Sequence, residues 1–168
     1  MFSFKGKSEG GPRRERVIDQ KRTAYRASVE FPVLYSVEGR EGMRGAAAND
    51  LSAGGLRLMG DEDLINGTVV VFNFTLPNEL VRTVQVEREI EEKSPFGTRK
   101  KKIMVPPASF DQMTIRAKVV IAFLNTKRRK FAHGVQFLEI DDRTKEEIQR
   151  FIHIWQIKQL RERAQRDD

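Results

Sequence analysis

The chain has 168 residues, enough for one domain of ordinary size, and it has no cysteine, which excludes disulfides, thiol nucleophiles and thiolate metal sites. Its 31 lysines and arginines outnumber its 24 aspartates and glutamates, and the formal net charge of +7 favours anionic partners such as nucleotides, nucleic acids, acidic membranes or acidic proteins. The longest wholly apolar run, Val119 to Leu124, is too short to span a membrane, and the N-terminus lacks the apolar core of a signal peptide. We therefore expect a cytoplasmic protein.

The first part of the chain is predicted to be a mobile lead-in followed by a strand. Residues 1–20 are rich in glycine, serine, lysine and arginine, a composition typical of a flexible basic tail. Residues 27–38 alternate between apolar and polar side chains, which predicts a first strand. Pro32 lies inside this stretch and favours an edge position or a bulge, because proline cannot donate a ladder hydrogen bond.

A tight polar turn is predicted over residues 49–55, directly before an alternating strand. The side chains of Asp50 and Ser52 can bond backbone groups two residues on, and Gly54 and Gly55 tolerate positive φ. Such a turn gathers a carboxylate, a hydroxyl and bare backbone at a strand end, where a flat polar ligand has access. The same pattern also occurs in hairpin corners without a chemical role, because short motifs give many false positives.

The middle of the chain is predicted to be mainly β, with strands over residues 67–77, 115–124 and 131–140. Residues 80–114 are expected to form a protruding hairpin. Its basic run, Arg99 to Lys102, either grips an anion or a partner or is a solvated tip. Six or more short strands, separated by turn signals and followed by one helix, predict a small antiparallel barrel.

A C-terminal helix is predicted over residues 143–168. Thr144 and Glu147 fit a capping box at its start. An apolar stripe at helical spacing is expected to cover the barrel, and it consists of Ile148, Phe151, Ile152 and Trp155. The part of the helix beyond this stripe is a candidate seam for a homodimer.

Two motifs together point to a family. Arg22 and Arg26 lie four residues apart ahead of the first strand, and the pattern Asp50-x-Ser52-x-x-Gly55 follows at the next turn. This order and spacing resembles the PilZ family, in which the two motifs together bind the bacterial second messenger cyclic di-GMP. Each motif is weak alone, and the two in this order are a much more specific signal.

The resemblance covers roughly residues 21–155, and residues 80–114 are its least similar part. It implies a mainly β fold, a small antiparallel PilZ-type β-barrel over residues 21–142. The basic tail 1–20 would precede this barrel, and the helix 143–168 would follow it.

The resemblance also implies roles for the residues of the first motif. The guanidinium groups of Arg22 and Arg26 would form forked bonds to phosphate oxygens and stack on a guanine. Lys21 places another cation beside the first arginine. We hypothesise on this ground that two cyclic di-GMP molecules bind each chain. The alternative is that Lys21 is a solvated surface residue without a role in binding.

In the second motif, the resemblance assigns the guanine edge to Asp50, whose carboxylate would accept from the N1 and N2 hydrogens. Ser52 would bond a phosphate or a purine edge. Gly54 and Gly55 would let the ligand approach the backbone, and Gly55 is the glycine that the motif requires.

The function expected from these observations is a non-enzymatic cyclic di-GMP receptor without another cofactor. It would change conformation on binding and signal through an unidentified protein partner in motility, biofilm or exopolysaccharide control. Two alternatives stay open: a nucleotide-free PilZ-like adaptor and a basic nucleic-acid-binding module, although the latter lacks interleaved exposed aromatics. An enzyme is disfavoured because neither His133 nor His153 lies near a nucleophile or acid pair in the sequence, and no metal-ligand spacing occurs.

Overall fold

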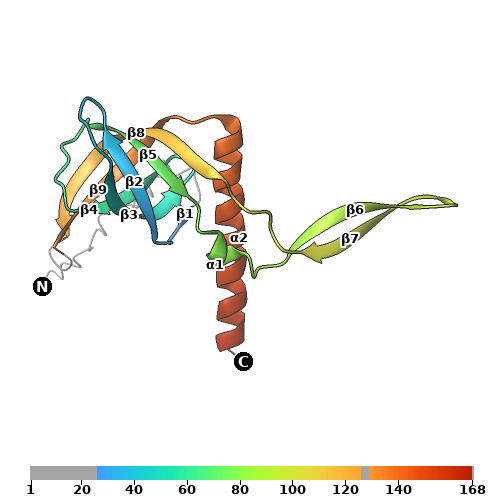
Figure 1. The fold of residues 1–168 in the computed structure, drawn as a ribbon. Helices are drawn as coiled ribbons and strands as arrows, with labels where there is room; N and C mark the ends of the chain where they lie inside the picture. Colours follow the sequence, from blue (N-terminus) through green and yellow to red (C-terminus); the bar gives the residue numbers. More distant parts are fainter. Residues whose placement is uncertain (1–25, 126–128, 168) are drawn as a thin grey trace, which may run out of the picture.

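The computed structural model describes residues 26–125 and 129–167 (Figure 1). The predicted tail 1–20 and the candidate ligand residues Lys21 and Arg22 lie outside the described residues. The elements in chain order are β1 (Arg26–Ala27), β2 (Phe31–Val37), β3 (Arg44–Ser52), β4 (Gly55–Gly60), β5 (Val69–Thr75), α1 (Asn78–Val81), β6 (Val86–Ser94), β7 (Gly97–Val105), β8 (Gln112–Asn125), β9 (Lys130–Glu139) and α2 (Asp142–Arg166).

Six strands form a closed antiparallel barrel, which confirms the predicted fold class. Their order is β3-β2-β5-β8-β9-β4, and β4 pairs back onto β3 to close the sheet. The inner faces supply the core, in which Phe72, Leu58 and Ile115 are almost completely buried. Closure leaves these six strands without the exposed edges that invite aggregation.

The predicted first strand is divided in two by a break at residues 28–30. β1 and β2 both pair with β3, as the partners Ala27 and Leu51 and the partners Phe31 and Ala48 show. Val29 stays buried across the break. The apolar alternation therefore predicted burial correctly, but it did not predict where the ladder of backbone hydrogen bonds is interrupted.

Helix α2 runs beside the barrel and extends past it to the C-terminus (Figure 1). Its N-cap is Asp141, whose side chain accepts a hydrogen bond from the backbone N–H of Thr144 at 2.7 Å. The predicted capping box with Thr144 as the cap is therefore wrong, because Thr144 is already inside the first turn. The buried side of the helix consists of Ile148, Phe151, Ile152 and Ile154, and Trp155 is half-buried against the core.

Strands β6 and β7 form a separate two-stranded ribbon that projects away from the barrel and from α2 (Figure 1). The projecting part is shorter than the predicted hairpin over residues 80–114. Val81, Val84 and Phe110, which flank the ribbon in the sequence, are buried in the barrel core. None of the helices in the described residues is long and apolar enough to cross a bilayer.

Candidate functional site

The polar turn predicted over residues 49–55 is a two-residue hairpin loop between β3 and β4. Ser52 pairs with Gly55, and Ala53 and Gly54 connect them. The hydroxyl of Ser52 accepts a hydrogen bond from the N–H of Gly54 at 3.3 Å and donates one to the carbonyl of Gly55 at 3.2 Å. Because Ser52 is buried, this hydroxyl stabilises the turn and is not presented to a ligand.

Asp50 lies in a β-bulge. The register of β3 against β4 shifts between Asn49 and Ser52, and Asp50 has a φ of 49°. The left-handed backbone of this segment therefore occurs at the aspartate, whereas positive φ was expected at the two glycines. Ala48 and Leu51 are completely buried with two residues between them, so the bulge leaves both Asn49 and Asp50 half-exposed.

The carboxylate of Asp50 has a cationic neighbour that the motif does not include. Arg57 on β4 lies across from Asn49, and its Nη1 is 3.4 Å from Oδ2 of Asp50. Both side chains are partly exposed, at 44% for Arg57 and 31% for Asp50, so this ion pair contributes little stability. Its consequence is local: a ligand that uses the carboxylate of Asp50 also meets the guanidinium of Arg57.

Arg26 is held next to the second motif by the β1–β3 ladder. It lies directly opposite Ser52, although 25 residues separate them in the sequence. The Arg26 side chain is exposed and borders a groove of about 400 Å³. The other wall of this groove comes from α2 and includes Trp155, Gln156 and Arg163.

The two glycines of the turn have different structural roles. A Cβ atom on Gly55 would lie 2.0 Å from the carbonyl oxygen of Val135 on β9, so only glycine allows this strand approach. A Cβ atom on Gly54 would meet nothing closer than the Ser52 hydroxyl, at 3.9 Å. The geometry therefore indicates that Gly55 is needed for packing against β9, and not for access of a ligand to the backbone as expected. Gly54 is exposed and borders open space.

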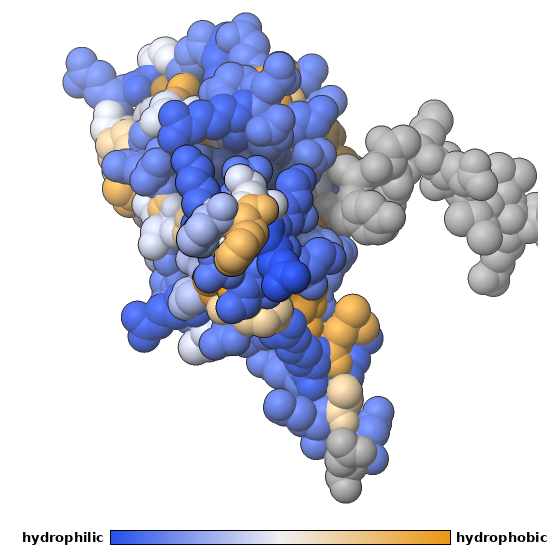
Figure 2. All heavy atoms as spheres, turned by 90° about the vertical axis from the view of Figure 1, so that its right-hand side faces the viewer, coloured by the Kyte–Doolittle hydropathy of each residue, from blue (hydrophilic) through white to orange (hydrophobic). Residues whose placement is uncertain are grey.

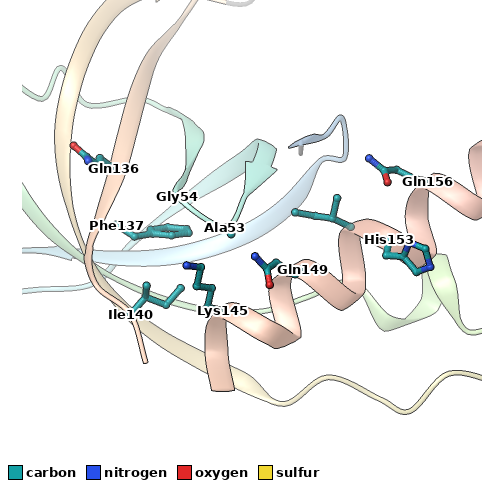
Figure 3. Close-up of a pocket in the computed structure, with 10 residues that line it drawn as sticks. Ala53, Gly54, Gln136, Phe137, Ile140, Lys145, Gln149, His153 and Gln156 are labelled. Carbon is teal, nitrogen blue, oxygen red and sulfur yellow. The ribbon is translucent and has the colours of Figure 1, made fainter. Parts of the chain in front are cut away.

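A second groove, of about 870 Å³, lies between the Ala53–Gly54 turn and α2 (Figure 3). Figure 3 shows Lys145 and Gln149 on the helix beside the turn, with Phe137 at the end of β9. The carbonyl of Gly54 accepts a hydrogen bond from the N–H of Phe137 at 2.9 Å, which fixes the turn against β9. Gln156 borders both grooves, so the two grooves are neighbours along α2.

Sequence reasoning missed the contribution of α2 and of Arg57. The helical pattern marks which side of α2 is buried, but it does not tell which strand the neighbouring polar residues Gln149 and Gln156 approach. Arg57 had a weak signal, since it is the outward residue of an alternating strand two positions after the motif. In the part of the chain that the structure describes, no three potential metal ligands cluster together.

The chain was compared with family models, curated protein sequences and solved structures. No protein-family model and no curated protein sequence matches the chain. The solved structure of the Bacillus subtilis inhibitor of motility (MotI/DgrA) matches with a TM-score of 0.60 and 18% identity over 89% of this chain, which spans 58% of that protein. The PilZ domain of YcgR from Escherichia coli, solved with c-di-GMP, matches with a TM-score of 0.48 and 15% identity, over 87% of this chain and 98% of that one.

At this identity, the likeness to MotI/DgrA establishes the fold and nothing more. MotI/DgrA is a PilZ-domain protein, and the likeness extends over most of the barrel and helix described above. The six closed antiparallel strands and the C-terminal helix agree with that architecture. The chain therefore has a PilZ-type fold.

Proposed function

We propose that the chain is a receptor for cyclic di-GMP that acts as a non-enzymatic adaptor. The observation that carries this proposal is the register of β1 against β3, which sets Arg26 directly opposite Ser52. The last residue of the first motif and the middle residue of the second motif are thereby neighbours on one sheet. A ligand in contact with both needs to reach only from one strand to the next, a spacing of about 5 Å.

In this proposal, Arg26 binds a phosphate or stacks on a guanine, and Arg22 and Lys21 add cations from the segment that precedes β1. The carboxylate of Asp50 accepts from the guanine edge, next to Arg57. Two ligand molecules per chain remain part of the proposal, because Lys21 adds a cation beside Arg22 that would help neutralise a stacked pair of ligands.

Two motif residues have supporting roles in this scheme. Ser52 shapes the turn through its bonds to Gly54 and Gly55, and Gly55 permits the close approach of β9. The geometry of the turn explains why Ser52 and Gly55 belong to the motif. Among the described residues, Arg26, Asp50 and the exposed backbone at Gly54 would contact the ligand. Ligand specificity then depends on a turn that is held rigid from inside the barrel.

The output of binding is proposed to pass through α2 to a protein partner. Gln156 and Arg163 of α2 border the groove that begins at Arg26, so a ligand there contacts the barrel and the helix at once. If the protein binds the ligand more tightly when α2 is in one of two positions, ligand binding shifts the population toward that position. The name of the structural neighbour MotI/DgrA makes motility the first process to examine.

Calorimetric titration with cyclic di-GMP tests the receptor proposal. Binding at micromolar concentration or tighter is expected, with at least tenfold weaker binding in each of Arg22→Ala, Arg26→Ala and Asp50→Ala. Arg88→Ala is a matched control, because it removes an exposed arginine from the ribbon that lies outside the site. A stoichiometry near one would refute the two-ligand part, and absence of binding would refute the receptor proposal.

A nucleotide-free adaptor is the second candidate, and one specific observation favours it. The Ser52 hydroxyl is used inside the turn and the Asp50 carboxylate is paired with Arg57, so two polar groups of the motif already have partners without a ligand. If the titration shows no binding while the variants stay folded, this candidate replaces the receptor.

A further inference from the structure

The ribbon of β6 and β7 has no part in the proposed ligand site. We call residues 86–105 the arm. It points away from the barrel and from α2 (Figure 1), and every residue from 91 to 102 is exposed. Viewed along its length, the end of the arm shows an apolar spot surrounded by hydrophilic side chains (Figure 2). Phe96 at the tip is 100% exposed, so no described part of the chain covers it.

Both edges of the arm are long and regular. The ladder runs without a register shift from Val86 opposite Val105 to Ser94 opposite Gly97. Among the described residues, β7 pairs only with β6, so its second edge carries backbone N–H and C=O groups that no other described strand bonds. An isolated two-stranded ribbon is marginally stable in water, and a third strand would stabilise it.

The two strands of the arm differ in charge. β6 carries four glutamates together with Arg88 and Lys93, whereas β7 carries four consecutive cations, Arg99 to Lys102, and no acid. Lys100 pairs with Glu89 at 3.0 Å, and Lys102 pairs with Glu87 at 2.7 Å, so one face of the arm is neutralised.

The opposite face of the arm keeps cationic charge beside apolar side chains. This face carries Arg88, Arg99 and Lys101 with one acid, Glu92, which lies directly opposite Arg99, so the face keeps a net positive charge. Lys101 lies opposite Ile90, and the half-buried Ile103 follows two residues later on the same face. Along the free edge of β7, this face therefore presents two successive positions, Arg99 and Lys101, that favour an acidic neighbour, followed by Ile103, which favours an apolar one.

A second copy of this chain fits the β7 edge of the arm poorly. On the β7 edge, a two-fold axis that pairs the basic stretches of two arms would set the four cations Arg99 to Lys102 against the same four cations of the other copy. Pairing of β6 with β7 of another copy avoids this repulsion, but it is a head-to-tail contact that does not close into a dimer. Lysine on an edge strand is a known protection against such self-pairing.

We propose that the free edge of β7 accepts an extended acidic segment of a partner protein as a third strand. The backbone ladder gives the affinity, and acidic side chains opposite Arg99 and Lys101 give the specificity. Phe96 offers the same segment an apolar contact at the end of the arm. This inference deepens the adaptor part of the proposed function, because it locates the partner surface on an element separate from the ligand site.

The unpaired backbone edge argues for a protein segment over two other anionic partners. The free edge of β7 offers a row of backbone N–H and C=O groups that no other described strand bonds. A lipid surface or a nucleic-acid backbone cannot continue a ladder of backbone hydrogen bonds, whereas an extended peptide segment can. Only a polypeptide strand therefore uses both the backbone edge of β7 and its cations.

The test uses a labelled synthetic peptide that alternates glutamate and valine and has a leucine at each end. Fluorescence anisotropy with the full-length protein is expected to show saturable binding that weakens as salt is raised. The double variant Arg99→Glu/Lys101→Glu should bind the peptide at least tenfold more weakly, and Phe96→Ser should bind it more weakly than the wild type. Bound peptide should also slow amide hydrogen exchange along residues 97–105.

The control variant Arg82→Glu/Lys118→Glu reverses two exposed cations outside the arm and should bind the peptide as the wild type does. The neutral variant Arg99→Gln/Lys101→Gln, which adds no repulsion to the ribbon, should lose part of the affinity. Equal affinity in the charge-reversed arm, or equal binding of a lysine–valine peptide, would overturn the proposal. So would tighter arm-dependent binding to phosphatidylglycerol vesicles or duplex DNA than to the peptide.

Cyclic di-GMP titration of the arm variant separates this proposal from the receptor proposal. Because the arm does not border either groove, Arg99→Glu/Lys101→Glu should bind cyclic di-GMP as the wild type does. Loss of peptide binding with intact nucleotide binding supports the arm proposal. Nucleotide binding with no peptide binding in the wild type would refute the arm proposal and leave the receptor standing.

Discussion

Arg26 on β1 and Ser52 on β3 are direct cross-strand partners, and this pairing joins two motifs that the sequence keeps apart. β1 contains only two residues, and its second residue, Ala27, is buried opposite Leu51. The burial of this short pair fixes the position of Arg26 without involving its side chain. The backbone of the arginine is therefore positioned by the core, while its side chain stays exposed.

Gly55→Ala is expected to destabilise the fold by about 1–3 kcal/mol, the usual cost of overpacking a close contact. The added Cβ would lie 2.0 Å from the carbonyl oxygen of Val135, a backbone atom that moves only if β4 and β9 separate. Urea denaturation measures the effect. Gly54→Ala is the matched control and should change stability far less, because its Cβ meets nothing within 3.9 Å. Equal effects at the two glycines would contradict this interpretation.

Ser52→Ala is expected to lower the free energy of unfolding by about 1–3 kcal/mol, because the N–H of Gly54 and the carbonyl of Gly55 lose a buried partner. Thermal unfolding measures the loss. Ser52→Thr keeps the hydroxyl and serves as the comparison. If Ser52→Ala weakens cyclic di-GMP binding without lowering stability, the hydroxyl contacts the ligand, and its assignment to the turn is wrong.

The sequence predicted those features that depend on neighbouring residues. The apolar alternation from Val29 to Tyr35 correctly predicted which residues of the first strand are buried. The number of short strands correctly predicted a barrel. The bulge at Asp50 was not predictable, because it results from the register of β3 against β4 and not from local preference. A glycine at position 50 would have been the sequence signal for a positive φ, and an aspartate gives a weaker one.

The candidate site depended on distant residues that no local pattern connects. The need for glycine at Gly55 comes from Val135, 80 positions later, and the groove beside the turn is completed by Gln156 of α2. A motif search identifies Asp50, Ser52 and Gly55 as a set. Only the three-dimensional arrangement separates the exposed carboxylate from the two residues that shape the turn.

Trp155 is expected to report ligand binding through its fluorescence. It is the single tryptophan of the chain and borders the same groove as Arg26, and Lys158 lies 5.3 Å from its ring centroid. Cyclic di-GMP in this groove should change the intensity or wavelength of its emission. Trp155→Phe should abolish the signal while calorimetric binding persists. Unchanged emission at a ligand concentration that saturates calorimetric binding would place the ligand away from α2.

Stability is expected to fall as the pH drops through the range in which histidine titrates. Burial lowers the pKa of His133, and the nearby Asp63 carboxylate opposes this shift only in part. Nε2 of His133 accepts a hydrogen bond from the N–H of Leu64 at 2.9 Å, so the folded protein holds the neutral ring. The unfolded chain, with the ordinary histidine pKa of about 6.5, takes up a proton first.

The sign of the effect follows from this difference. The contribution of His133 to stability is complete above about pH 6.5, decreases by at most about 1.4 kcal/mol per pH unit below it, and becomes constant once the folded protein is also protonated. Chemical denaturation between about pH 5 and 7.5 measures the slope. His133→Gln should flatten the slope in this range, whereas replacement of the exposed His153 by glutamine should keep it. Identical slopes in the wild type and His133→Gln would show that other groups account for the pH dependence.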